Sequence, residues 1–188
     1  MIKNRRAFIV GIKSYKLSIK EKKFLIKYKP WGVILFLRNI KSVKQTKNLT
    51  DSIKKIFKDK NYPILIDQEG GRVNRLSNII SFDNFTSEYF GNLYKKDIMK
   101  FNIIYKLFID NTSHLLKLIG ANINTLPVLD LKVKGASNII GDRSFGDTPK
   151  TVINIANSFI DGMNEAGMEA IGKHFPGHGG IHADTHLS

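Results

Sequence analysis

The sequence has 188 residues and carries 30 lysines and arginines against 16 aspartates and glutamates, which gives a formal net charge of +14 at pH 7. Its hydrophobic content of 42% and its length suit a folded protein with one sizeable core, and we expect a single domain over residues 1–188. Because the sequence holds no cysteine, it excludes disulfides, thiolate zinc sites and a cysteine nucleophile.

Neither a membrane nor a nucleic acid is an expected partner. No stretch approaches the roughly 18 consecutive apolar residues that a membrane span needs. The apolar run at residues 7–12 is too short for the core of a signal peptide, so we expect a cytoplasmic protein. The lysines are scattered from Lys3 to Lys173 without a nucleic-acid-binding motif, although the net charge alone keeps a basic nucleic-acid binder as an alternative.

The first part of the chain alternates short apolar runs with amphipathic segments. The run at residues 7–12 predicts a strand, and Ser18 with Glu21 forms a capping box that starts a helix extending to about Tyr28. The continuous apolar run at residues 31–37 is typical of a strand buried on both faces. Apolar positions three or four residues apart then predict a helix over residues 43–56, and a third strand is expected at 62–66.

The second part begins with an aperiodic stretch. Residues 77–92 predict a long loop with a short helix. Thr148 and Pro149 form the start of a later helix, as an N-cap followed by proline at the first helical position. We expect helices over residues 104–118 and 149–166. We expect strands over residues 121–126 and 168–171.

This alternation predicts a parallel α/β sheet. Polar residues repeatedly follow the predicted strands, where a (β/α) barrel builds its active site. A doubly wound sheet would also place a site there, but Gly11-Ile-Lys-Ser14 supplies no glycine-rich phosphate loop. We therefore favour the barrel.

The last sixteen residues, 173–188, are rich in glycine and proline and predict a loop that carries titratable side chains. Four histidines spaced by four residues would form a metal-binding stripe on a helix, but Pro176 and the neighbouring glycines prevent that helix. We predict no metal and no cofactor. The histidines are His174, His178, His182 and His186.

Five segments resemble motifs of family 3 glycoside hydrolases of the bacterial β-N-acetylhexosaminidase type. Trp31 to Ile40 resembles the family's GGVILFxRNI strand, Asp67 to Arg75 its DxEGGRVxR signature, Pro127 to Asp130 its APVxD segment, Ile140 to Phe145 its IGxRSF loop, and Lys173 to His186 its KHFPGHG…DSH loop. The resemblance implies an α/β fold, an incomplete TIM (β/α)8 barrel with about five of the eight βα units, since a closed barrel needs about 200–250 residues.

The resemblance also implies an activity and a set of site residues. The activity is hydrolysis of terminal β-linked N-acetylglucosamine from muropeptides or oligosaccharides, in peptidoglycan recycling. His186 resembles the acid/base of a retaining mechanism, a role that suits a side chain that titrates near neutrality, and Asp184 resembles its partner. The nucleophile is expected to be an aspartate beyond residue 188. The expected sugar-binding residues are Asp67, Arg75, Arg143, Lys173 and His174.

Two alternatives remain beside an active glycosidase. In the first, the chain is a truncated, inactive remnant. In the second, it is one part of a split enzyme in which a second chain supplies the remaining strands. Within the motifs, Glu69 is expected to be structural and to pair with Arg72 or Arg143, while Arg38 and Asp130 are expected to support the mouth of the barrel.

Overall fold

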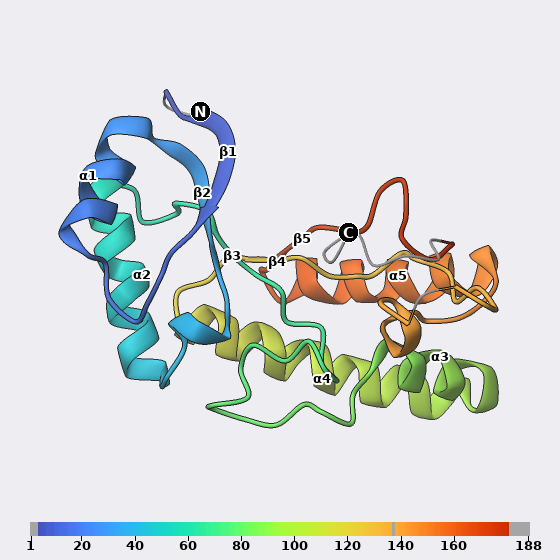
Figure 1. Cartoon of the computed structure of the whole chain (residues 1–188). Helices are drawn as coiled ribbons and strands as arrows, with labels where there is room; N and C mark the ends of the chain where they lie inside the picture. Colours follow the sequence, from blue (N-terminus) through green and yellow to red (C-terminus); the bar gives the residue numbers. More distant parts are fainter. Residues whose placement is uncertain (1–3, 137, 181–188) are drawn as a thin grey trace.

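The computed structural model describes residues 4–136 and 138–180, in which strands alternate with helices (Figure 1). The strands are β1 (Arg6–Gly11), β2 (Pro30–Leu35), β3 (Ile64–Ile66), β4 (Ile123–Asn124) and β5 (Glu169–Ala170). The α-helices are α1 (Ile19–Tyr28), α2 (Val43–Phe57), α3 (Ser87–Lys96), α4 (Ile98–Leu118) and α5 (Pro149–Glu165), and the short 3-10 helices are η1 (Leu37–Asn39) and η2 (Gly141–Arg143).

The strands form a single parallel sheet in the order β1-β2-β3-β4-β5. The register places Leu65 of β3 beside Ile34 of β2 and beside Ile123 of β4, and it places Ile123 beside Glu169 of β5. The predicted parallel α/β sheet is therefore confirmed. A doubly wound sheet reverses its strand order at a switch point, and the order of the described strands does not reverse.

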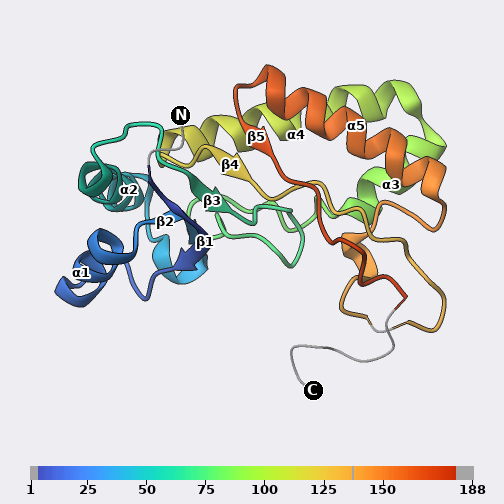
Figure 2. The same cartoon turned by 90° about the horizontal axis from the view of Figure 1, so that it is seen from above.

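Helices line one side of the row of strands. Seen from above, α1, α2, α4 and α5 lie along its outer side (Figure 2). Each of these helices buries an apolar side chain in the same cluster as the β3 residues Ile64 and Ile66, because its apolar positions recur at helical spacing. The buried helix residues include Leu25, Ile53, Leu116 and Ile155.

The predicted helix starts at Ser18 and Thr148 are confirmed, and the predicted start at residue 104 is wrong. The hydroxyl of Ser18 accepts a hydrogen bond from the backbone N–H of Glu21, whose carboxylate accepts the N–H of Ser18 in return. Thr148 caps α5, with Pro149 at its first turn. α4 begins at Ile98, six residues before the start that apolar spacing predicts, because the side chain of Asp97 accepts the N–H of Lys100. The same residue is the C-cap of α3, where its backbone N–H donates to the carbonyl oxygen of Leu93.

The strands β4 and β5 are shorter than the apolar runs at 121–126 and 168–171 predict. Side-chain amides replace part of the backbone ladder. The Oδ1 atom of Asn122 accepts the N–H of Ile64 at 2.8 Å, and the Oδ1 atom of Asn124 accepts the N–H of Gln68 at 3.0 Å. Pairing resumes beyond the strand ends, where Val128 forms a parallel bridge with Lys173.

Aromatic rings join α3, α4 and α5. The ring of Phe108 on α4 lies 5.1 Å from that of Phe90, 5.4 Å from Phe82, 5.7 Å from Phe85 and 6.2 Å from Phe159, measured between centroids. Such contacts add stabilisation beyond the apolar area that they bury. The cluster therefore fixes the long loop after β3 against the helices that follow it.

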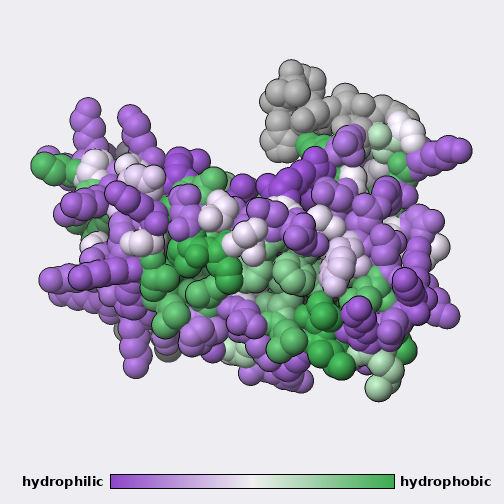
Figure 3. All heavy atoms as spheres, turned by 90° about the horizontal axis from the view of Figure 1, so that it is seen from below, coloured by the Kyte–Doolittle hydropathy of each residue, from purple (hydrophilic) through white to green (hydrophobic). Residues whose placement is uncertain are grey.

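The outer side of α4 is less polar than that of α2. Met99, Ile103 and Leu107 are exposed at a spacing of four residues, and the face that holds α4 shows hydrophobic patches (Figure 3). On α2 the exposed positions include Lys44 and Lys55. Within the described part of the chain, no helix has the length and apolar content that a membrane crossing requires.

We expect Phe108→Ala to lower the free energy of unfolding by about 3–5 kcal/mol, because truncating a buried phenylalanine leaves a cavity among its neighbours. Leu107→Ala is the matched control, since Leu107 is 55% exposed on the same helix, and it should cost less than about 1 kcal/mol. Chemical denaturation followed by circular dichroism measures both. Equal losses in the two variants would contradict a core centred on Phe108.

Candidate active site

Residues that follow β3, β4 and β5 meet at one edge of the sheet. Asp67 and Glu69 come after β3, Thr125 comes directly after β4, and Lys173 comes shortly after β5. The carboxyl ends of parallel strands lie at the same edge, so these side chains converge although they are far apart in sequence. Hydrogen bonds and ion pairs join all of them in one network.

Asp67 lies at the centre of this edge. Its Oδ1 atom accepts the hydroxyl of Thr125 and lies 3.0 Å from Nζ of Lys173, while its Oδ2 atom is 3.7 Å from Nη2 of Arg75. Burial alone would raise the pKa of Asp67, but the charge of Lys173 and the hydrogen bonds from Thr125 and Lys173 outweigh it and lower the pKa. The carboxylate is therefore ionised at neutral pH.

Glu69 is the more deeply buried carboxylate, with a side chain that is 2% exposed. Its Oε2 and Oε1 atoms accept Nε and Nη2 of Arg143, both at 2.9 Å, and Nζ of Lys173 lies 2.6 Å from Oε1. Burial would raise the pKa of Glu69, but the hydrogen bond from Arg143 and the charges of Lys173 and Arg143 lower it. The expected pairing with Arg143 is confirmed.

Arg72 points away from Glu69. Its Nε atom pairs with Asp142 at 3.0 Å, and its Nη2 atom donates to the backbone carbonyl groups of residues 138–140. The double glycine before it allows this turn: Gly70 has a φ of +91°, and a Cβ atom there would lie 2.2 Å from the carbonyl oxygen of Phe85. The turn thus directs Glu69 to the site and Arg72 to the loop that carries η2.

Lys173 is the shared cation of the site. Its ammonium group lies within hydrogen-bond distance of Asp67, Glu69 and Thr125, the last at 3.2 Å. An ammonium group has three N–H donors, and this arrangement offers one acceptor to each. Sequence reasoning does not single out Thr125, because a threonine after an apolar run carries no distinctive pattern.

His174 follows Lys173 and binds a different carboxylate. Its Nδ1 atom lies 2.6 Å from Oδ2 of Asp130, whose side chain is fully buried. Burial would raise the pKa of Asp130, but hydrogen bonds from the His174 ring and from the backbone of His178 and His174 lower it to about 2. The expected supporting role of Asp130 agrees with this geometry, whereas its contact with His178 could not be read from spacing.

The structure thus joins Asp67, Arg75, Arg143 and Lys173 in a single network and places His174 beside it. Whether these residues bind a sugar stays a prediction. Asp184 and His186, the predicted catalytic pair, lie outside the described residues. Within the part of the chain that the structure describes, no three histidine, aspartate or glutamate side chains are grouped as metal ligands. The rings of His174 and His178 lie edge to face, 5.2 Å apart.

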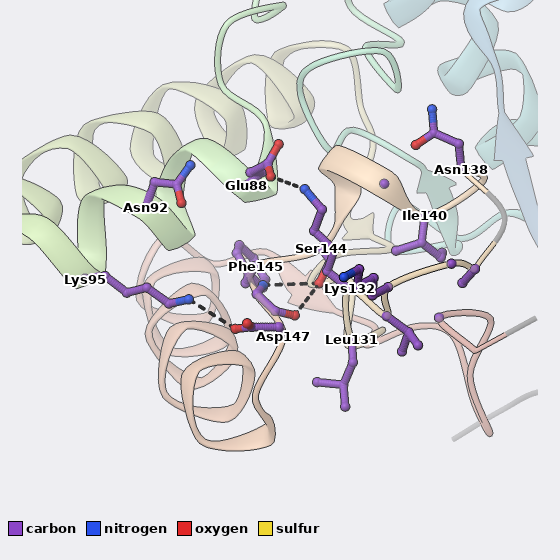
Figure 4. A pocket seen from close by; sticks show the side chains of 17 residues that line it. Glu88, Asn92, Lys95, Leu131, Lys132, Asn138, Ile140, Ser144, Phe145 and Asp147 are labelled. Atoms are coloured by element: carbon purple, nitrogen blue, oxygen red, sulfur yellow. Dashed lines mark hydrogen bonds and ion pairs between the residues drawn. The ribbon is translucent and has the colours of Figure 1, made fainter.

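A cleft of about 490 Å³, lined by both polar and apolar residues, adjoins the site between α3 and the segments around η2 (Figure 4). Lys132 pairs across it with Glu88 of α3, and Lys95 of α3 lies 3.2 Å from Asp147. Gly179 also lines the cleft, so it borders the segment that follows His174.

This chain is similar to known proteins in both sequence and fold. The model of the "Glycosyl hydrolase family 3 N terminal domain" matches residues 6–188. A beta-hexosaminidase of Alkalilimnicola ehrlichii is 37% identical over 186 residues, which is 95% of this chain and 51% of that protein. A beta-hexosaminidase of Tolumonas auensis is 39% identical over 181 residues, again 95% of this chain and 51% of that protein. The chain spans about half the length of the curated relatives it matches.

Solved structures agree with these matches. Native NagZ from Neisseria gonorrhoeae superposes with a TM-score of 0.85 at 32% identity, covering 98% of this chain and 53% of that one. NagZ from the same organism in complex with N-trifluoroacetyl-D-glucosamine gives a TM-score of 0.84 at 32% identity, covering 98% and 54%. These neighbours are TIM-barrel enzymes, so the predicted barrel architecture of the five-stranded sheet is confirmed.

We expect Glu69→Gln to lower the free energy of unfolding by about 3 kcal/mol near neutral pH, because it removes one charge from a buried ion pair. Since the folded pKa of Glu69 lies below its ordinary value of 4.5, its stabilising charge is present above that pH and is lost as pH falls through the folded pKa. The difference between the variant and the unmodified chain should therefore shrink below pH 4.5.

Thermal unfolding measured over a series of pH values tests this expectation. Glu88→Gln is the control, because Glu88 forms an exposed pair with Lys132 that should contribute less than about 1 kcal/mol. A difference for Glu69→Gln that stays constant from neutral to acidic pH would contradict the ionised, buried state of Glu69.

Proposed function

Because this chain belongs to glycoside hydrolase family 3, we propose that it forms the sugar-binding part of a β-N-acetylhexosaminidase that removes terminal β-linked N-acetylglucosamine. The observation that carries the proposal is the network in which Lys173 joins Asp67 and Glu69 at the carboxyl ends of the strands. In barrel enzymes this edge of the sheet holds the active site.

The chemistry of the network suits a sugar. Carboxylate oxygens accept hydrogen bonds from hydroxyl groups, and lysine and arginine donate to ring, hydroxyl and acetamido oxygens. The Oδ2 atom of Asp67 is 3.7 Å from Arg75, beyond hydrogen-bond distance, so a hydroxyl group could bridge the two side chains. We assign sugar binding to Asp67, Arg75, Arg143, Lys173 and His174. A sugar oxygen would take the place of the Thr125 hydroxyl, the longest of the three contacts at 3.2 Å, as an acceptor of Lys173.

The ionisation of the described carboxylates supports a histidine as the acid/base. A general acid must carry a proton near neutral pH, and the pKa values of Asp67 and Glu69 are both lowered. Neither therefore fits the protonated carboxylic acid that most glycosidases use. We assign this role to His186, with Asp184 as the group that orients its ring.

In the proposed retaining mechanism, a carboxylate attacks the anomeric carbon while His186 gives its proton to the departing oxygen. Water then attacks the anomeric carbon and gives a proton to His186, the bond between that carbon and the carboxylate breaks, and both groups are restored. The resemblance to the family places the nucleophilic aspartate in a later barrel strand, so we assign it to a residue outside this sequence. We further propose that the substrate is a muropeptide of peptidoglycan recycling and that the reaction is cytoplasmic.

We also propose that a further polypeptide segment, in the same or a second chain, packs beyond β5. Among the described strands, β1 and β5 each pair on one side alone. Near β5, Leu129 and Ile171 are 41% and 38% exposed, and Phe175 is 96% exposed. Apolar side chains beside an unpaired strand edge favour the addition of further strands.

Release of nitrophenol from 4-nitrophenyl N-acetyl-β-glucosaminide tests the proposal. The assay is run on this chain alone and on the chain joined to, or mixed with, a polypeptide that supplies later barrel strands. We expect turnover in the completed protein and its loss on His186→Ala. Turnover that is unchanged in His186→Ala would refute the role of His186. Absence of turnover in every form would refute the proposed glycosidase activity.

In the completed protein, we expect Asp67→Asn to reduce kcat/KM by about 10- to 100-fold, since a hydrogen bond to a charged group contributes about 1.5–3 kcal/mol. Asp110→Asn is the matched control: Asp110 pairs with Lys106 on α4, away from the site, has a 47% exposed side chain, and should change kcat/KM by less than about threefold. Similar effects of the two substitutions would argue against sugar binding by Asp67.

A further inference from the structure

The segment that follows Lys173 is fixed to one buried carboxylate. The Oδ2 atom of Asp130 lies 2.6 Å from Nδ1 of His174 and accepts the backbone N–H of the same residue at 3.1 Å. Its Oδ1 atom accepts the backbone N–H of His178 and, at 3.1 Å, that of Gly179. A side chain with no exposed surface thus receives four hydrogen bonds from residues 174–179.

The surrounding backbone holds both partners in place. The hydroxyl of Ser144 lies 2.7 Å from the carbonyl oxygen of Asp130, which ties Asp130 to the segment after η2. A Cβ atom on Gly179 would lie 2.2 Å from the carbonyl oxygen of Leu131, so only glycine brings this N–H close enough to the carboxylate. The surrounding backbone therefore holds the Asp130 carboxylate within hydrogen-bond distance of the turn.

This contact fixes the tautomer of His174. A carboxylate with a pKa of about 2 is ionised at neutral pH and can only accept hydrogen bonds. The Nδ1 atom of His174 must then carry the proton that it donates to Asp130. The Nε2 atom is left to accept a hydrogen bond from a ligand when the ring is neutral, or to donate one when the ring is protonated.

We propose that Asp130 is a positioning residue of the sugar site. It holds His174 in the Nδ1–H tautomer, and it anchors residues 174–179, from which the chain continues to Asp184 and His186. The proposal rests on the proposed function only in naming a sugar as the ligand of His174. The tautomer and the anchored turn are properties of this chain that can be measured without any turnover.

The first test is the tautomer of His174 in the unmodified chain, read from the ¹⁵N chemical shifts of its ring nitrogens and assigned with His174→Gln. We expect a protonated Nδ1 and, at a pH where the ring is neutral, an unprotonated Nε2. A neutral ring that carries its proton on Nε2 overturns the proposal. This measurement needs no change at Asp130, so it holds even if substitutions there prevent folding.

The second test compares Asp130→Asn with the unmodified chain by amide hydrogen exchange. Loss of the charged acceptor should speed exchange at His178 and Gly179 by about tenfold or more, since hydrogen bonds to charged groups are the stronger ones. Asp142→Asn is the control, because Asp142 is exposed and contacts Arg72 instead. Unchanged exchange at both amides in folded Asp130→Asn overturns the anchoring role.

A titration with N-acetylglucosamine then connects the anchor to the ligand. In the unmodified chain we expect the Nε2 resonance of His174 to shift on saturation, and we expect Asp130→Asn to weaken binding by about tenfold. Equal affinity in the two proteins overturns the positioning role. If the unmodified chain binds no sugar, the proposed function fails for this chain, while the tautomer and exchange results still decide whether Asp130 holds the turn.

Discussion

The candidate site depends on one ammonium group, on a side chain that is 15% exposed, shared by two carboxylates. Asp67 and Glu69 lie two residues apart after β3, and both would be unstable as bare anions away from water. Lys173, which arrives after β5, lies within hydrogen-bond distance of both and of Thr125 after β4. Breaking a buried ion pair costs several kcal/mol because it leaves an uncompensated charge. The ends of three strands are therefore held together by charge compensation as well as by backbone pairing.

This compensation also determines what the site can do. The cations lower the pKa values of Asp67 and Glu69, so both carboxylates remain acceptors near neutral pH and neither is a proton donor. The described residues thus form a rigid set of acceptors and cationic donors, which suits the recognition of a polar ligand. In the proposed function, proton transfer needs a group that titrates near neutrality, which is the chemical reason for assigning it to the histidine His186.

The rest of the described fold supports this edge of the sheet. Arg72 holds the loop of residues 138–142, and that loop carries Arg143 to Glu69. Phe108 and its neighbouring rings pack the long loop after β3 against α3, α4 and α5. Because each functional side chain lies at the end of a short strand or in a cross-linked loop, its position follows from packing at some distance from the site.

The sequence by itself determined which elements form and which residues could carry chemistry. Apolar spacing, the Ser18 capping box and the Thr148–Pro149 start are local signals, because they depend on residues within one or two turns. The motif from Asp67 to Arg75 likewise marked a polar segment after a buried strand. These features agree with the parallel sheet and with the positions of Asp67, Arg75, Arg143 and Lys173 in one network.

Only the tertiary structure decided how those residues pair. From the sequence, either Arg72 or Arg143 could pair with Glu69. The turn at Gly70 directs Arg72 to Asp142 instead, so Glu69 pairs with Arg143, 74 residues later. Asp130 is fixed by contacts with a turn 44 to 49 residues away, and Thr125 by a contact with Asp67, the carboxylate that follows the neighbouring strand. Local sequence patterns do not predict such contacts, because the contacts form only when separate strand ends are brought to the same edge of the sheet.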